Sequence, residues 1–174
     1  MYAALSIKNP KMIISNNKAV FNNKTERMKA PYAKGQKCPD CGNAMKVRDS
    51  KKRGPVKTET GKEIMYQLRR YFCKNCVAIH TELPSDLSPY MRYQTDLIQE
   101  AIENGSENGP GVENSTINRW RTIFLAKITA AANAAKLEIK KPGEGRWLAD
   151  ILIKIFDSGK KHTRYTFSPS AGKG

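Results

Sequence analysis

The chain has 174 residues, a length that suits one domain or two very small ones. Lysine and arginine number 31 against 16 acidic residues, so the net charge is +15 and a polyanionic partner is favoured. The sequence has no apolar run of the roughly 20 residues that span a bilayer, and no N-terminal secretory signal. We therefore expect a cytoplasmic protein with no membrane partner, in a reducing compartment where paired cysteines bind metal more often than they form disulfides.

The first two segments of the chain differ in pattern. Residues 1–36 carry scattered lysines and two Asn-Asn pairs without sustained periodicity, so we expect a basic, flexible arm. Residues 37–80 hold both cysteine pairs, and between them apolar side chains recur at every second position, the period of a strand: Ile64, Tyr66, Leu68 and Phe72. This segment is predicted to form short antiparallel strands with a basic loop.

The four cysteines form two Cys-x2-Cys units, a spacing that lets one tight turn direct two thiolates at a single metal ion. Together they predict one structural Zn²⁺ bound by Cys38, Cys41, Cys73 and Cys76. Bound iron or a redox pair are the alternatives, although a redox motif favours a helix after the cysteines, and Gly42 with strand-like residues follows Cys41 instead. His80 is near enough to be considered as a ligand, but we leave it out, and His162 is expected to be solvated.

Helical spacing begins in the third segment, residues 81–139. Apolar residues line one face of a helix near residues 97–102, and Asn104-Gly105 supplies a stop. A second helix is expected to start at the N-cap Ser115 and bury Ile117, Trp120 and Phe124. This order predicts a helix-turn-helix, although the connection between the two helices is longer than the 3–4 residues of a compact one. The alternative is an ordinary amphipathic helix with a solvated outer face.

The last segment, residues 140–174, is predicted to contain an amphipathic helix near residues 147–156 and a polar tail. Its apolar face has two uses that the sequence leaves open. It either packs inside the monomer or joins two copies in a homodimer.

Three stretches carry a resemblance to a known family: residues 71–76, 80–84 and 89–93. They resemble small bacterial proteins in which a zinc ribbon precedes a helix-turn-helix, similar to the DNA-binding regions of insertion-sequence transposases and often named transposase-like or left uncharacterised. Residues 115–120 are similar to the start of the recognition helix of this family, and residues 158–159 and 163–168 to its C-terminal segment. The resemblance implies zinc on the four cysteines and DNA binding, and it has no counterpart for residues 1–36.

We expect no catalysis. The acidic residues form no recognisable two-metal set, and Walker, Gly-x-Ser-x-Gly and His-Glu-x-x-His motifs are absent from the sequence. The grouping of His162, Arg164 and Tyr165 in a short tail is interpreted as chance.

Together these patterns predict an α+β protein with an N-terminal zinc ribbon, a helix-turn-helix domain and a C-terminal amphipathic helix. It is expected to be a nucleoid-associated, sequence-specific DNA-binding protein, either transposase-like or a transcriptional regulator, with a separate recombinase or polymerase as a conceivable partner. The predicted phosphate anchors are Lys46, Arg48, Lys51, Lys52, Arg53, Lys57, Arg69 and Arg70. At the predicted recognition helix, Ser115 and Thr116 suit a phosphate, and the outward-facing residues are Thr116, Asn118, Arg119, Arg121 and Thr122. Of these, Asn118, Arg119 and Arg121 are expected to read base edges.

Two alternatives remain. An RNA-binding or ribosome-associated protein would stack unpaired bases on Tyr66, Tyr71 and Phe72. A protein-interaction module of the transcription or recombination machinery would use the helix at 147–156 as its contact face.

Overall fold

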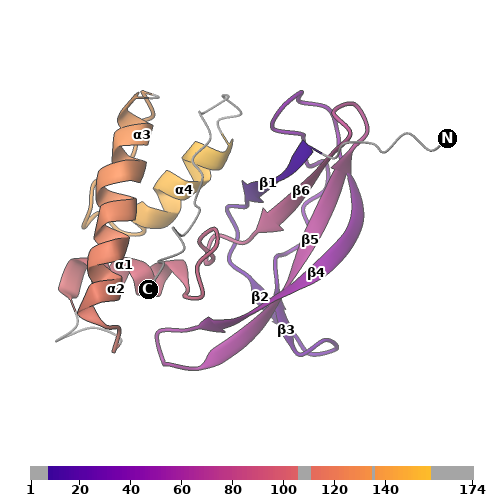
Figure 1. Cartoon of the computed structure of the whole chain (residues 1–174). Coiled ribbons are helices and arrows are strands. Elements are labelled where there is room, and N and C mark those ends of the chain that lie inside the picture. The colour runs from indigo at the N-terminus through magenta and orange to yellow at the C-terminus, as the bar shows by residue number, and fades with distance from the viewer. Residues whose placement is uncertain (1–7, 106–110, 135, 158–174) are drawn as a thin grey trace, which may run out of the picture.

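A computed structural model describes residues 8–105, 111–134 and 136–157 of the chain (Figure 1). Six strands in this part of the chain form one curved, mixed sheet in the order β1-β6-β5-β3-β2, with β4 also paired to β5. The strands are β1 (Lys8–Ile14), β2 (Val20–Asn22), β3 (Arg27–Lys29), β4 (Lys46–Lys57), β5 (Glu63–Cys73) and β6 (Ala78–Leu83).

Strand β5 is the centre of the sheet. Along one side it pairs antiparallel with β4, from Lys46 opposite Phe72 to Lys57 opposite Glu63. Along the other side its second half pairs antiparallel with β6, and its first half runs parallel to β3, where Met28 lies beside Tyr66. Strand β1 is parallel to β6.

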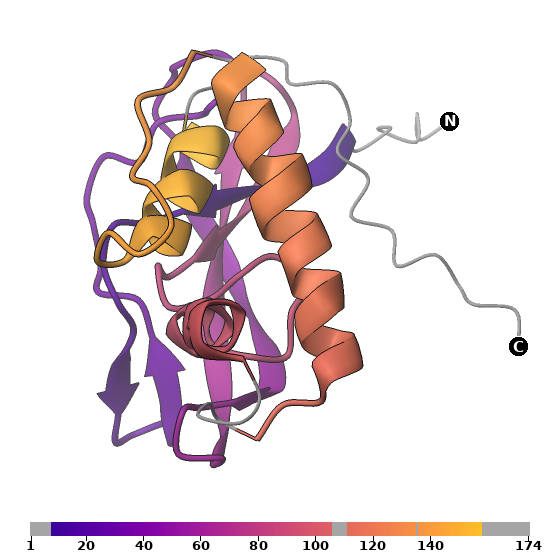
Figure 2. The same ribbon diagram turned by 90° about the vertical axis from the view of Figure 1, so that its left-hand side faces the viewer.

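The helices cover one face of this sheet, as Figure 2 shows. Helices α2, η1 and α3 follow one another without a break as one long helix, whose middle part, η1, is π-helical. Helix α1 ends where Gly105, at φ +73°, donates its N–H to the Ala101 carbonyl, as the Asn-Gly stop predicted. The helical elements are α1 (Thr95–Asn104), α2 (Asn114–Trp120), η1 (Arg121–Ile128), α3 (Thr129–Ala134) and α4 (Trp147–Asp157).

The two faces of β5 are buried in two separate cores, because side chains alternate along a strand. On the helix-covered face, Tyr66 and Leu68 pack in a large core with residues from β1, β6 and the helices. On the other face, Tyr71 and Cys73 pack in a small core with Met45 and Cys38. The predicted strand period is therefore confirmed, with both sets of side chains buried in part.

The expected fold, a zinc ribbon followed by a separate helix-turn-helix domain, is wrong. The helices lie where their periodicity predicted them, but Ile117, Trp120 and Phe124 are buried in the same core as Tyr66 and Leu68. Helix α2 does contact α1, but the core that both helices bury is shared with α4 and the sheet, so the two helices form no separate domain. Strands β4 and β5 are also long, at 12 and 11 residues.

Two terminal segments also differ from expectation. Residues 8–29, expected within a flexible arm, supply β1, β2 and β3, and Ile14 and Ala19 are buried in the main core. Helix α4 buries Leu148, Ile151 and Leu152 in the chain's own core, so those side chains are not available as a contact face for a second copy. The tail, including His162, Arg164 and Tyr165, lies outside the described residues.

Candidate metal centre

The first cysteine pair lies in a tight turn between β3 and β4. The N–H of Cys38 donates to the Asn43 carbonyl, and the N–H of Gly42 donates to the Cys38 carbonyl, each at 2.8 Å. Gly42 has φ +71°, a left-handed conformation that glycine adopts without a steric penalty. The turn therefore brings the Cys38 and Cys41 side chains to the same side.

The second pair closes the hairpin between β5 and β6. Cys73 is the last residue of β5 and is paired with Ala78, the first residue of β6. Val77, which follows Cys76 as Gly42 follows Cys41, has φ +51°. The two turns thus use a left-handed residue at the same position after the second cysteine.

The four sulfur atoms meet in one cluster. All lie within 4.8 Å of one another, with Sγ–Sγ distances of 3.9 Å for Cys38 and Cys76 and 3.6 Å for Cys41 and Cys73. A tetrahedral ion with metal–sulfur bonds of about 2.3 Å places its ligands about 3.8 Å apart. Cys38 and Cys73 are buried, and Cys41 and Cys76 are half-buried. The four cysteines are free thiols that could hold a metal ion, as their spacing predicted.

The thiols differ in acidity. A hydrogen bond with the Asn43 backbone, followed by one with the Cys76 thiol, lowers the pKa of Cys41 to about 6. The same hydrogen bond to Cys41 raises the pKa of Cys76 to about 12, and burial raises the pKa of Cys38. Cys41 therefore loses its proton more readily than Cys38 or Cys76.

His80 lies directly behind the cluster. It is fully buried on β6, and its Nε2 atom is 3.5 Å from the sulfur of Cys38. Ligand atoms of Cys38, Asp40 and His80 also fall within 4.8 Å of one another. The predicted set of four cysteine ligands did not include His80. The signal that could have placed it is its position on the strand that leaves the second turn, where alternate residues return to the cysteine face.

A buried ion pair between Arg69 and Glu82 lies beyond His80 on the cysteine face of the sheet. Arg69 Nη1 lies 2.9 Å from Glu82 Oε2, and the Tyr71 hydroxyl donates to the same oxygen at 3.1 Å. Arg69 also donates to the carbonyls of Ala30, at 2.6 Å, and Pro31, at 3.2 Å. The expected role of Arg69 as a phosphate anchor therefore does not fit, because its guanidinium is bound inside the protein.

Three other predicted nucleic-acid contacts are engaged within the fold. Arg53 Nη2 donates to the carbonyls of Ser88, at 2.6 Å, and Met91, at 2.7 Å. Arg70 forms a bidentate pair with Asp49, which lowers the pKa of that carboxyl. Arg121 donates to the Ile102 carbonyl at the end of α1 through Nε and Nη2.

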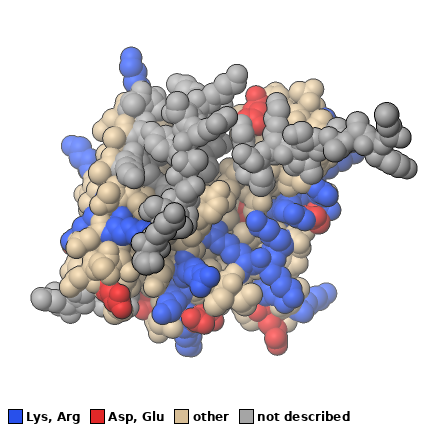
Figure 3. Space-filling model, in the orientation of Figure 1, with Lys and Arg blue, Asp and Glu red and all other residues tan. Residues whose placement is uncertain are grey.

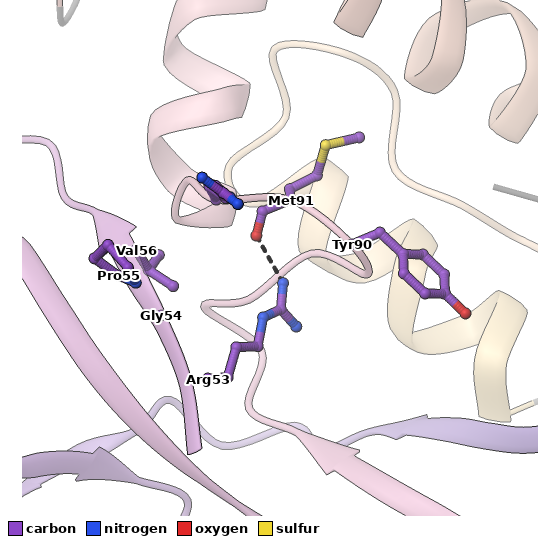
Figure 4. Close-up of a pocket in the computed structure, with 7 residues that line it drawn as sticks. Arg53, Gly54, Pro55, Val56, Tyr90 and Met91 are labelled. Atoms are coloured by element: carbon purple, nitrogen blue, oxygen red, sulfur yellow. Dashed lines mark hydrogen bonds between the residues drawn. The ribbon is translucent and has the colours of Figure 1, made fainter. Parts of the chain in front are cut away.

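Arg53 also lines a small hollow of about 190 Å³ between β4 and the connector before α1. In Figure 4 its guanidinium lies beneath the Met91 carbonyl, and the ring of Tyr90 points away from it. The hollow is smaller than the roughly 300 Å³ at which ligand pockets begin. Its walls are residues 53–56 and 90–92.

The remaining predicted phosphate anchors are exposed along β4: Lys46, Arg48, Lys51, Lys52 and Lys57. Figure 3 shows lysine and arginine side chains gathered over the strand half of the molecule. On α2 and the start of η1, the exposed members are Ser115, Asn118, Arg119 and Thr122, whereas Thr116 is half-buried. Of the aromatic residues expected to stack on RNA, Tyr66 and Tyr71 are buried and Phe72 is half-buried.

Residues 38–120 match a family described as a domain of unknown function (DUF6431). The match begins at Cys38 and ends at Trp120, so it contains both cysteine pairs, β4 to β6, α1 and α2. No curated protein and no solved structure matches the chain. Among the described residues, no helix is long and apolar enough to cross a membrane.

Proposed function

We propose that this protein binds one structural Zn²⁺ through its four cysteines and binds DNA through the exposed cations of β4. The resemblance to transposase DNA-binding regions favours a role as a transposase-like factor or a transcriptional regulator. The single observation that carries the DNA proposal is the set of five exposed lysine and arginine side chains along one strand, β4, which begins just after the first cysteine turn.

The donor set favours zinc. Four thiolates close a tetrahedral shell and leave no position for substrate or water, which is typical of a structural zinc site. Thiolate ligands also suit zinc or iron better than calcium or magnesium, which prefer oxygen. A bound ion would join the turns at Cys38 and Cys73, between which β4 and β5 run. Metal binding would then contribute to folding.

Native mass spectrometry tests the metal. Protein purified without added metal should carry one zinc ion, and a thiol reagent should count no reactive cysteine before chelation and four afterwards. Cys73→Ser should abolish zinc binding, because the hydroxyl replaces a buried thiolate. Purification of coloured, iron-loaded protein, or of stable protein with four reactive thiols, would reject the zinc assignment.

The charge on β4 favours a phosphate backbone. The one acidic residue of this strand, Asp49, forms a bidentate pair with Arg70 and lies 3.8 Å from Arg48, so it offsets only part of the charge of the exposed cations. Strand β4 pairs with β5 alone, so it is an edge strand, and its exposed cations project from the edge of the sheet. Cations on an edge strand can approach the phosphates of a duplex without displacing a neighbouring strand.

Salt-dependent binding to a duplex tests this surface. Exchange of Lys46, Arg48 and Lys52 for glutamine should weaken binding and reduce the slope of log affinity against log salt by up to about 0.9 for each lost contact. The matched control exchanges three exposed lysines far from β4 in sequence, Lys136, Lys140 and Lys141, and removes the same charge. An equal loss in both variants would mean that net charge, rather than β4, binds the duplex.

A further inference from the structure

Tyr32 is an exposed aromatic residue whose ring is supported by a buried arginine. Its ring lies over the Arg69 guanidinium, 5.2 Å from carbon to ring centroid, and 61% of the residue is exposed. Tyr32 lies in the segment between β3 and the first cysteine turn, and the carbonyls of the two preceding residues, Ala30 and Pro31, accept hydrogen bonds from Arg69. The same guanidinium therefore supports the ring and fixes the backbone that carries it.

The arginine that supports the ring is held in place without any ligand. Arg69 is 9% exposed, and its ion pair with the buried Glu82 holds it in place. An aromatic ring supported in this way loses little conformational freedom when a second ring stacks on it, and preorganisation of this kind favours affinity. Arginine planes and aromatic rings are the usual partners of unpaired bases.

Polar and basic side chains surround this ring on the sheet. Lys29 and Lys52 are both register partners of Gln67, so the three residues form one row across β3, β5 and β4. In the next row, Ser50 is the partner of Arg69 and accepts a hydrogen bond from Gln67 at 2.8 Å. Residues two apart along a strand are about 7 Å apart and share a face, so this row lies beside the platform of Tyr32 and Arg69.

The helices cover the opposite face of the sheet, and beyond the small core around Tyr71 and Cys73 this face is covered only in part. Tyr66 and Leu68, whose side chains point to the helices, are buried. Met65, on the same face as Gln67, is 37% exposed, and Lys52 is exposed. The face thus combines a stacking ring with cations, and Glu82, the acidic residue beside Arg69, is buried and paired with it, a combination complementary to a single nucleic-acid strand.

We propose that Tyr32 stacks on an unpaired base of DNA, while Lys29 and Lys52 bind the phosphates on either side of that base. This inference rests on the proposed DNA binding and specifies its substrate as DNA with a single-stranded segment. Adjacent strands are about 4.8 Å apart, so the two lysines lie about 10 Å apart across β5. That span accommodates one stacked nucleotide with its flanking backbone.

The test compares a blunt duplex with the same duplex carrying a single-stranded extension, at about 150 mM salt, by fluorescence anisotropy. Tyr32→Ala should weaken binding of the extended probe roughly 5- to 100-fold and leave the blunt duplex unchanged, because only the unpaired base stacks. Tyr32→Phe should keep the affinity. Tyr90→Ala is the matched control, since Tyr90 is 63% exposed on the connector before α1.

The outcomes separate this inference from the proposed function. If the blunt duplex binds with its dependence on β4 while Tyr32→Ala leaves the extended probe unchanged, the platform is wrong and the proposed function stands. If neither probe binds, both fail. Tighter, Tyr32-dependent binding of the matching RNA strand would overturn the assignment to DNA, and an equal loss in Tyr32→Ala and Tyr90→Ala would show that the effect does not come from the platform.

Discussion

The Nε2 atom of His80 lies 3.5 Å from the sulfur of Cys38, and both side chains are buried. This contact places an imidazole beside one cysteine of a cluster that already offers four sulfur ligands. When the cluster binds a metal ion, an N–H donated to the thiolate sulfur would orient that ligand and offset part of its negative charge. His80 would then act as a positioning residue rather than as a ligand.

Replacement of His80 tests this role. His80→Phe should weaken metal binding roughly 10- to 100-fold, because the Cys38 thiolate loses its donor, and His80→Gln, which keeps an N–H, should recover part of the loss. Competition with a chelator of known affinity measures both. Thr81→Val is the control, since Thr81 is buried on the same strand and points to the opposite face. Unchanged metal affinity in His80→Phe would contradict the role.

Local patterns identified the parts of this protein that depend on neighbours in sequence. The two Cys-x2-Cys turns form because each needs only five or six residues, and they correctly predicted the sulfur cluster. The strand period of β5 and the helical spacing of α1, α2 and α4 are equally local. The parallel pairing of β1 with β6 is different, because it joins residues about 70 positions apart and leaves no periodic signal in a seven-residue strand.

The same limit applies to the arginines. In sequence, Arg53, Arg69 and Arg121 look like any other solvent-facing cation near a basic segment. Their partners are two carbonyls of the connector, the carboxylate of Glu82 and the end of α1, which only the folded chain brings near. A positive residue in a basic protein is therefore weak evidence of a nucleic-acid contact until its burial is known.

The buried pair of Arg69 and Glu82 should be costly to break from one side. Arg69→Met leaves the Glu82 carboxylate buried without its partner and should lower the free energy of unfolding by about 3–5 kcal/mol. Arg69→Met combined with Glu82→Leu should recover much of that loss, because no unpaired charge remains. Urea unfolding measures both variants. Arg70→Met, which breaks the half-buried, more accessible pair with Asp49, should have a far smaller effect, and equal losses at the two positions would refute the distinction.

Arg121 should matter for stability rather than for base recognition. Its guanidinium donates twice to the Ile102 carbonyl and so satisfies the last turn of α1. Arg121→Ala should therefore lower the free energy of unfolding by about 1–2 kcal/mol. Arg119→Ala, an exposed neighbour, should change it by less than about 0.5 kcal/mol. A loss of sequence preference in Arg121→Ala with unchanged thermal stability would be inconsistent with this contact.

Position 77 should be more stable with glycine than with a residue that carries a side chain. Its φ of +51° is costly for a β-branched residue, and the equivalent position in the first cysteine turn is Gly42 at +71°. Comparison of Val77→Gly with Val77→Ala isolates the backbone, since both remove the branched side chain. The glycine variant should be the more stable by about 1 kcal/mol, because alanine keeps the left-handed penalty. The same comparison at Ala78, in the adjacent extended strand, should give the opposite sign, with Ala78→Gly less stable by roughly 0.5–1 kcal/mol. Urea unfolding in the metal-loaded state measures the native protein, the two variants at position 77 and Ala78→Gly. An alanine variant at least as stable as the glycine variant at position 77 would show that this backbone angle carries no cost.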